Sequence, residues 1–450
     1  MSQAVEQGAT LRLASWVVGT TLQDIPALVQ HEGLRAWLNF LGCAVGGVDQ
    51  ETRRTFERSL AGTAGRGSST VFGCGRSSDC VHAALANALA ATVYGFCDTH
   101  AQAIVHPSPP ALAAALALGE QRKAHGRDLL LAGILGLEVA CRLSKAISVH
   151  PAVGNLGWLQ SGLVGGVGAV VACGKLLGLD VGQLASAIGL AAAQGQGLRV
   201  AMGSMSTPLI HAQGADTGLR AALLAAEGFT GPQNGIEGEY GFARMFAPSA
   251  FLDGLTDRLG KAYELSALTY KPFPAGIVAH PAIDAALRLY RRGLDAANIV
   301  RVDAVISPAA AKLTARRHPA DSTDAQFSLQ HWSAVALIHG TARVQDADPP
   351  RLQEPAVVAL REKIHVRADE RITADAADMS ITLQDGRQLR ESVEHCVGSI
   401  AHPMGDADIE NKVRGLCEPV MGAARCTALI GETWALRDML DVSCLGAICR

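Results

Sequence analysis

The chain has 450 residues, of which 39 are basic and 42 are acidic, so its formal net charge is −3. This balance excludes the large single-sign field with which proteins attract nucleic acid or an anionic membrane, and we expect a small molecule as the partner. Hydrophobic residues make up 49% of the chain but aromatic residues only 4%, which favours closely packed helices over a β-sandwich. Because the chain exceeds the size of one compact core, we expect two domains.

The cysteine content and the hydropathy of the chain indicate its cellular compartment and whether it crosses a membrane. The 11 cysteines are an odd number without a CxxC pair, which indicates reduced thiols and argues against a disulfide framework or a zinc site. The first residues lack a basic start followed by a long apolar run, so no signal peptide is expected. The most apolar stretch, residues 162–174, is too short to span a bilayer, and its small residues suit a closely packed central helix. We therefore predict a cytoplasmic protein without a membrane segment.

The first part of the chain reads as helices. Apolar residues at helical spacing predict two amphipathic segments within residues 9–62. A glycine- and serine-rich loop with a possible short strand follows at 62–79, and it does not fit the GxxxxGKS or GxxxxGKT pattern of a phosphate-binding loop. From Cys80 to about Ala226 the pattern predicts nearly continuous helix, with loops at 150–158 and 194–208 and one further break.

A different pattern begins near residue 270. Residues 299–310 and 372–394 show the period-two alternation of strands. Asp385-Gly386 in the second segment is a strong hairpin signal. A helix is predicted at 325–340, between the strands.

These patterns predict a mainly α fold with two domains. Residues 1–268 form a large all-helical domain, which the helical tail 396–450 completes by packing back on it. Residues 269–395 form a smaller α+β domain.

The further break within the helical region, inside residues 91–120, carries the most chemistry. Alanine-rich runs lie on both sides, and between them stand Asp98, Thr99, His100 and His106. Two imidazoles, a hydroxyl and a carboxylate between apolar helices are poorly explained by packing, because buried polar groups need partners. Loops are also where binding and catalytic residues concentrate. We predict that this loop is part of a functional site.

The ionisable side chains of this loop have both a functional and a structural interpretation. His106 could be a general acid or base, since an imidazole titrates near neutral pH, or it could begin a helix and be satisfied by backbone groups. Asp98 could orient His100 or accept a carbon-bound proton itself, or cap the following turn. Cys97 is interpreted as a small buried filler, because the neighbouring carboxylate would raise the pKa of its thiol. A metal site is not expected, because the histidines lack ligand-like spacing.

Lys271 is the main candidate in the smaller domain. The proline that follows it favours an extended backbone at this lysine. Its ammonium could hold a carboxylate or stabilise an enolate, as an oxyanion hole does, although a surface charge is the alternative.

The order of several motifs resembles the MmgE/PrpD family, whose members include dehydratases, decarboxylases and an epimerase. The resemblance covers about residues 80–420 and implies a large helical domain, a smaller α+β lid, a homodimer, and a cofactor-free site at the domain junction. The motifs that carry it are Asp98-Thr99-His100, His106-Pro107-Ser108, GKLLGLD at 174–180, EGFTGP at 227–232, Lys271-Pro272-Phe273-Pro274 with His280-Pro281, and FSLQ at 327–330.

The chain departs from the family patterns in one direction, because ionisable residues give way to neutral ones. From the family's HAxDFDDTH pattern this chain lacks one histidine and two carboxylates. From the GWHPT pattern it lacks the histidine. From the TKPxHxGR pattern it lacks the lysine, the histidine and the arginine. A buried carboxylate without partners is strongly disfavoured, so citrate-like trianions are poor candidate substrates. A smaller carboxylic acid or a non-acid is more reasonable. The residues standing at the altered positions are Thr92, Gly95, Cys97, Leu159, Thr207, Ile210 and Gln213.

The resemblance also adds candidate residues by position. His331 stands where a tyrosine often follows the family's FSLP motif and could act as a replacement acid, while His280 stands at a helix entry. We predict Asp98, His100, His106, Lys271 and His331 as catalytic and Thr99, Gln160, Thr207 and His280 as substrate-binding residues. His211 and Gln213 are weaker candidates of the same kind.

Together these features predict a cofactor-independent lyase or isomerase that transfers a proton at the carbon next to a carboxylate or carbonyl of a small organic compound. Elimination, decarboxylation and epimerisation all remain open. The alternative is a diverged, non-catalytic or ligand-binding protein that keeps the scaffold after losing its chemistry.

Overall fold

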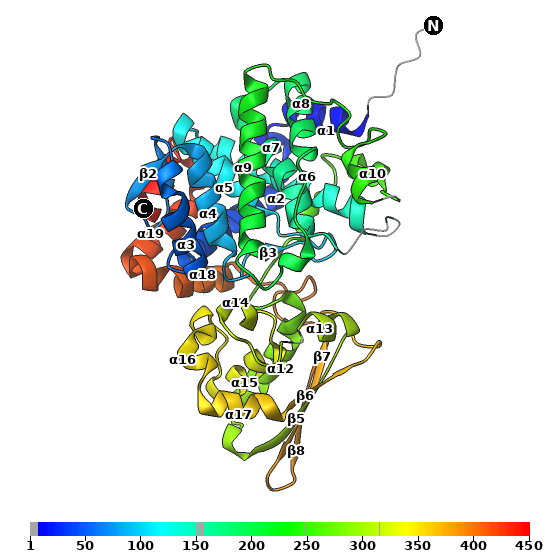
Figure 1. Ribbon diagram of the computed structural model, residues 1–450, viewed down its shortest axis with the longest axis vertical. Helices are drawn as coiled ribbons and strands as arrows, with labels where there is room; N and C mark the ends of the chain where they lie inside the picture. The colour runs from blue at the N-terminus through cyan, green and yellow to red at the C-terminus, as the bar shows by residue number, and fades with distance from the viewer. Residues whose placement is uncertain (1–7, 150–151, 153–156, 248, 315) are drawn as a thin grey trace. The chain divides into compact units, whose positions relative to one another are not determined.

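The computed structural model describes residues 8–149, 152, 157–247, 249–314 and 316–450, so most of the loop predicted at 150–158 lies outside the described residues. The chain forms two compact units. The larger comprises Met1–Val93, Cys97–Leu268 and Ile409–Arg450, and the smaller comprises Tyr94–Phe96 and Thr269–Asp408. The predicted fold class is confirmed: the protein is mainly α, with a smaller α+β part (Figure 1).

The larger unit is built from helices, with one short antiparallel hairpin of β1 (Ser69–Val71) and β2 (Arg76–Ser78) in the segment predicted as a loop with a strand. The two-residue strand β3 (Asp98–Thr99) lies in the polar loop. The helices are α1 (Ala9–Gly19), α2 (Ala27–Gly46), α3 (Glu51–Leu60), α4 (Cys80–Thr92), α5 (Ser108–Arg122), α6 (Gly126–Ser148), α7 (Gln160–Leu177), α8 (Val181–Ala192), α9 (Ser206–Ala226), α10 (Phe242–Phe246), α11 (Leu252–Thr256), α18 (Asp406–Met421), α19 (Ala423–Trp434) and α20 (Ser443–Cys449).

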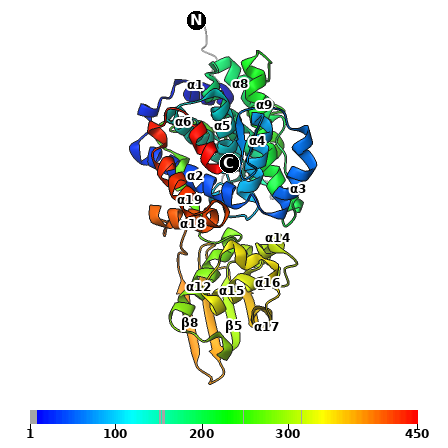
Figure 2. The ribbon, with the colours of Figure 1, turned by 90° about the vertical axis from the view of Figure 1, so that its left-hand side faces the viewer.

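Small residues let the central helices of this unit approach closely. Helices α5, α7 and α9 pack on one another, and Figure 2 shows α5 and α9 near the middle of the unit. A side chain at Gly218 of α9 would overlap the backbone of Gly166 and the methyl group of Ala169, both on α7. The predicted central helix is therefore α7, and its glycines set how near α9 can lie.

Helix α7 is long and apolar enough to cross a bilayer, and it is the one described helix with that property. It is 18 residues long and thus extends beyond the apolar stretch at 162–174. However, 83% of it is buried inside the protein, as in a core helix.

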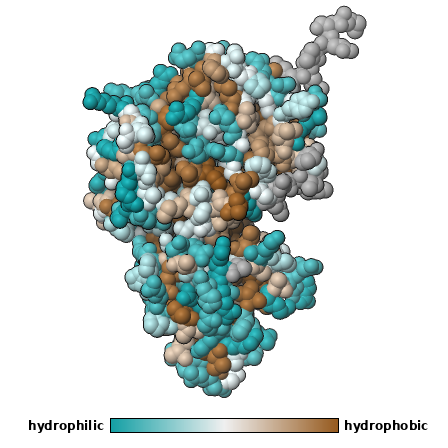
Figure 3. Space-filling view, viewed as in Figure 1, coloured by the Kyte–Doolittle hydropathy of each residue, from teal (hydrophilic) through white to brown (hydrophobic). Residues whose placement is uncertain are grey.

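Figure 3 shows apolar residues at the surface over the region of α9, where Met205, Leu209 and Leu224 are exposed.

The smaller unit holds a four-stranded sheet in the order β6–β5–β7–β8. The strands are β5 (Ile299–Ile306), β6 (Ile364–Ala368), β7 (Ala377–Leu383) and β8 (Gln388–Val393), and a short strand β4 (Thr269–Tyr270) lies outside this sheet. Strand β5 pairs in parallel with β6 and antiparallel with β7. The predicted hairpin is confirmed, because β7 and β8 are joined by a turn in which Gly386 has a φ of 83°.

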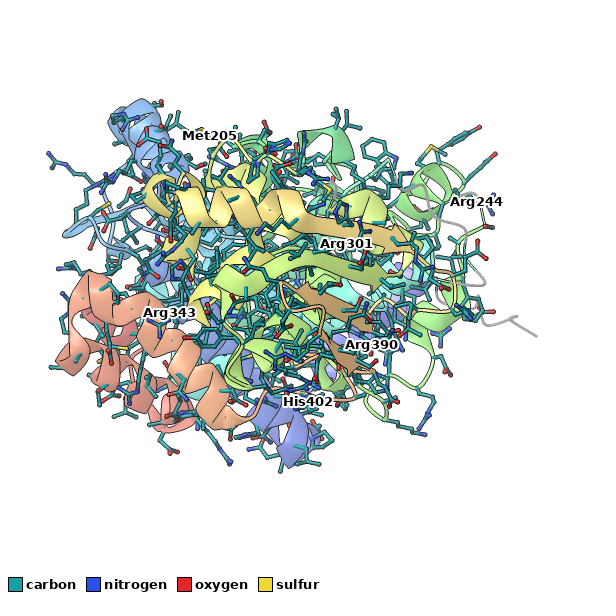
Figure 4. All side chains as sticks on the ribbon, turned by 90° about the horizontal axis from the view of Figure 1, so that it is seen from below. Met205, Arg244, Arg301, Arg343, Arg390 and His402 are labelled. Atoms are coloured by element: carbon teal, nitrogen blue, oxygen red, sulfur yellow. The ribbon has the colours of Figure 1, made fainter. Side chains whose placement is uncertain are left out.

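Helices cover one face of this sheet. Helix α12 (His280–Arg291) packs on β7, β8 and α15 (Leu329–His339), and α17 (Pro355–Lys363) packs on α15 and β5 (Figure 1). The register places Arg301 of β5 and Arg390 of β8, both labelled in Figure 4, on the opposite, open face. The remaining short helices of the unit are α13 (Pro308–Leu313), α14 (Ser322–Ala325) and α16 (Pro349–Leu352).

Candidate functional site

The polar loop between α4 and α5 buries a carboxyl group. Asp98 is fully buried, and Ser108, the first residue of α5, donates its hydroxyl to Asp98 Oδ2 at 2.7 Å. Within the part of the chain that the structure describes, Asp98 Oδ1 has no hydrogen-bond partner. Burial without full hydrogen bonding disfavours the carboxylate and raises the pKa of Asp98 to about 6. The group therefore exchanges its proton close to neutral pH.

His106 is held by the backbone of the same loop. Its ring Nδ1 lies 2.8 Å from the carbonyl oxygen of Asp98 and 3.0 Å from Thr99 Oγ1. A carbonyl oxygen only accepts hydrogen bonds, so Nδ1 carries the proton and Nε2 is the basic nitrogen of the neutral ring. The backbone N–H of His106 donates to Ser161 Oγ at 2.9 Å, which ties the loop to the first turn of α7. These contacts fix the orientation and the tautomer of the imidazole.

A second imidazole lies beside the first. The ring of His211, on α9, has its centroid 5.9 Å from that of His106, at an interplanar angle of 42°. His211 is buried, and its Nδ1 lies 3.0 Å from the carbonyl oxygen of Thr207. In Figure 1 the label β3 marks the polar loop beside the lower end of α9. The loop and α9 together present two rings whose Nδ1 atoms are both engaged by the main chain.

His100 is engaged differently, through both ring nitrogens. Its Nδ1 accepts the N–H of Ala103 at 3.1 Å, so Nε2 carries the proton and donates to Glu264 at 3.1 Å. Lys145 donates to the other carboxylate oxygen at 2.7 Å. Burial alone would raise the pKa of Glu264, but the hydrogen bonds from His100 and Lys145 outweigh it and lower the pKa to about 2. In this arrangement His100 anchors the loop to a carboxylate that is charged at neutral pH.

The predicted binding residues of the larger unit have mixed surroundings. Thr99 Oγ1 bonds the ring of His106, as described, whereas Thr207 Oγ1 donates to the carbonyl of Ala201 at 2.8 Å. Gln160 is buried at the start of α7, and among the described residues its Oε1 has no partner. Of the three, Gln160 keeps an amide oxygen that a ligand could use.

Apolar side chains occupy two positions at which the family patterns carry histidine. A Cβ atom at Gly197 would lie 2.9 Å from Ile210 Cγ2 and 3.6 Å from Leu159 Cβ, so these two side chains flank the same glycine. Gly197 itself has a φ of 114°, which a residue with a side chain rarely adopts. At Gly197 the backbone and the side chains of Leu159 and Ile210 therefore pack closely.

The remaining predicted residues lie in the smaller unit, each against a different main-chain carbonyl. Lys271 is buried and donates from Nζ to the carbonyl of Gly95 at 2.6 Å. His280 Nε2 lies 3.2 Å from the carbonyl of Ala275. His331 Nε2 lies 2.8 Å from a carbonyl oxygen, that of Asp346, and burial lowers the pKa of His331 to about 4. The ring of His331 is therefore neutral at physiological pH.

Gly95 also explains one departure from the family pattern. Its φ is 57°, and a Cβ atom there would collide with the side-chain oxygen of Gln326. An aspartate cannot replace this glycine without a shift of the backbone or of Gln326. Among the described residues, no group of three or more His, Cys, Asp or Glu side chains could hold a metal ion.

Comparisons with known proteins give two matches to domain families. Residues 11–253 match the MmgE/PrpD N-terminal domain, and residues 273–436 match the MmgE/PrpD C-terminal domain. The cis-aconitate decarboxylase of Aspergillus terreus is 26% identical over 97% of this chain and 95% of its own length. That of Mus musculus is 27% identical over 81% and 77%. The 2-methylcitrate dehydratase of Salmonella typhimurium is 25% identical over 60% and 59%.

Proposed function

Because the chain belongs to the MmgE/PrpD family, we propose that it is a cofactor-independent lyase or isomerase that moves a proton at the carbon next to a carboxylate or carbonyl of a small organic acid. Decarboxylase and dehydratase, the activities in the names of its relatives, are both lyase activities on organic acids. The chain is accordingly an enzyme of lyase type.

The observation that carries the proposed mechanism is the orientation of His106. Its Nδ1–H is fixed on the carbonyl of Asp98, so the neutral ring offers Nε2 as the base. A base so positioned needs no reorganisation of its own before it takes a proton from carbon, and general base catalysis of this kind contributes about 10²–10⁴-fold to a rate. Asp98, whose main-chain carbonyl holds the ring, has a side-chain pKa of about 6 and can hold or release a proton close to neutral pH.

Removing a carbon-bound proton places negative charge on the adjoining carboxylate, which then has enolate character. We assign the stabilisation of that charge to Lys271. Its ammonium is buried, where a charge interacts more strongly than in water. Preorganised donors of this type contribute about 10²–10³-fold.

The neutral replacements support a substrate with fewer carboxylates than citrate. Leu159 and Ile210 are apolar and pack around Gly197. The hydroxyl of Thr207 is already bonded to a main-chain carbonyl, that of Ala201. None of these three side chains can neutralise a carboxylate, and a buried carboxylate without a cation or donors is strongly disfavoured. We therefore propose a monocarboxylic or dicarboxylic acid as the substrate class.

Product analysis by NMR tests the proposal. The purified protein is incubated with cis-aconitate, 2-methylcitrate and a panel of unsaturated and hydroxylated mono- and dicarboxylic acids. We expect loss of water, loss of carbon dioxide or inversion with at least one smaller acid, at a rate that falls about 10²–10³-fold in Lys271→Met. His318→Gln is the matched control, since the His318 side chain is 69% exposed. Binding of an acid without any conversion by the unaltered protein would instead support the diverged, ligand-binding alternative.

A further inference from the structure

We propose that His211 is a second proton-transfer residue, which acts with His106 as an acid–base pair; this inference rests on the function proposed above. The two rings come from different parts of the larger unit, the polar loop and α9, and their centroids are 5.9 Å apart. Only 3% of His211 is exposed. The packing of the loop against α9 brings these two imidazoles together.

Both rings are held in the same tautomer. The Nδ1 of His106 faces the carbonyl of Asp98, and the Nδ1 of His211 faces the carbonyl of Thr207. Each Nδ1 therefore carries a hydrogen, and each neutral ring has Nε2 as its basic nitrogen. When a ring takes up a proton, the same Nε2–H becomes an acid. The pair thus supplies one neutral Nε2 that can act as base and one Nε2–H that can act as acid.

The hydrogen bond of His211 to Thr207 does not by itself explain a buried imidazole on α9. In an α-helix the carbonyl of residue 207 is already the acceptor for the backbone N–H of residue 211. The ring adds a second donor to an acceptor that the helix satisfies without it.

The chain also lacks imidazoles at the two nearby positions where the family patterns carry them. Leu159 and Ile210 stand there and flank Gly197. His211 is one residue beyond the histidine position of the TKPxHxGR pattern, on a different face of α9. The second acid–base group of this chain is thus supplied from position 211, next to His106.

Like-charge repulsion makes it unfavourable for two adjacent imidazoles to be positively charged at the same time. The pair therefore carries one proton in addition to the two Nδ1 hydrogens. His106 Nε2 takes the proton from carbon, and the electrons of the C–H bond enter the enolate. The imidazolium of His211 then gives its proton to the departing hydroxyl, which leaves as water while the enolate electrons form the C=C bond. In an epimerisation His211 gives the proton to the opposite face of the same carbon. Exchange with solvent returns the proton from His106 to His211.

The two roles separate in deuterium oxide. In His211→Gln we expect deuterium exchange at the substrate carbon to stay within about threefold of the unaltered protein, whereas product formation falls about 10²–10⁴-fold. In His106→Gln both should fall. An unchanged rate of product formation in His211→Gln overturns the inference, as does equal loss of exchange and product in that variant with unchanged circular dichroism. If the unaltered protein acts on no acid, the proposed function itself has failed.

A spectroscopic test needs no substrate. In protein labelled with ¹³C-histidine, the resonance of His106 is identified by its absence from His106→Gln. Removing the neighbouring imidazole in His211→Gln should move the titration midpoint of His106 upward, because a like charge is lost. His318→Gln should leave it in place. A midpoint that is the same in the unaltered protein, His211→Gln and His318→Gln would show that the rings do not act as a pair.

Discussion

Replacing Asp98 by asparagine should change how the stability of the larger unit depends on pH. Asp98 is fully buried, with one bonded oxygen on Ser108 and one without a described partner. Asparagine has nearly the same shape and keeps an oxygen that can accept the hydroxyl of Ser108, but it cannot ionise. The substitution therefore isolates the cost of the buried charge.

The size and sign of the effect follow from the two pKa values. The carboxyl has an ordinary pKa of 3.8 when exposed and a pKa of about 6 in the folded protein. Between these values the unfolded chain has released the proton while the folded chain still holds it, so the stabilising contribution is present below pH 3.8 and is lost as the pH rises through 6. A difference of about two pKa units corresponds to roughly 3 kcal/mol.

Urea unfolding at pH 4, 5, 6 and 7, followed by circular dichroism, measures this. The unfolding free energy of Asp98→Asn minus that of the unaltered protein should rise by about 2.5 kcal/mol from pH 4 to pH 7, because the unfolded carboxyl has already lost part of its proton at pH 4. Glu264→Gln is a control of opposite sign, because the pKa of Glu264 is lowered to about 2 and its contribution is lost as the pH falls. A difference for Asp98→Asn that stays flat over this range would refute the assignment of a buried, under-bonded carboxyl.

Three further substitutions test the packing and the electrostatics. Gly218→Ala should cost about 1–3 kcal/mol in urea unfolding, because the methyl group meets α7, whereas Gly415→Ala on α18 meets nothing within 4 Å and should stabilise by about 0.5–1 kcal/mol; equal effects would contradict the close approach. Arg142→Met leaves the Glu138 carboxylate buried without its partner at 2.6 Å and should cost about 3–5 kcal/mol, with part recovered in a double variant that also replaces Glu138 by leucine. In ¹³C-histidine spectra, the signal that His331→Gln removes should titrate near pH 4 and not near 6.5.

Sequence patterns were sufficient for the fold class. Alanine- and glycine-rich runs predicted the central helices, and Asp385-Gly386 predicted the β7–β8 hairpin, because each of these signals is local. The polar loop stood out because its side chains contrast with apolar neighbours on both sides. Strand β6 (Ile364–Ala368) was missed. Three of the five residues of this short edge strand are exposed, so its alternation of buried and exposed residues is weak.

The contacts inside the site could not be predicted in the same way. His211 is 105 residues from His106, and only the packing of α9 against the loop brings the rings together. Likewise, nothing near His100 in the sequence reveals that Glu264 accepts from its ring. Helical periodicity gives the phase of a face but not which other segment covers it.

The proposed mechanism depends most directly on His106 as the base that takes a proton from carbon. The decisive measurement is deuterium incorporation, in deuterium oxide, at a carbon next to a carboxylate in the substrate or product, read by NMR across the acid panel. We expect incorporation by the unaltered protein and by His318→Gln, and a fall of about 10²–10⁴-fold in His106→Gln. Incorporation that is equal in all three proteins, or absent from every acid with the unaltered protein, would contradict it.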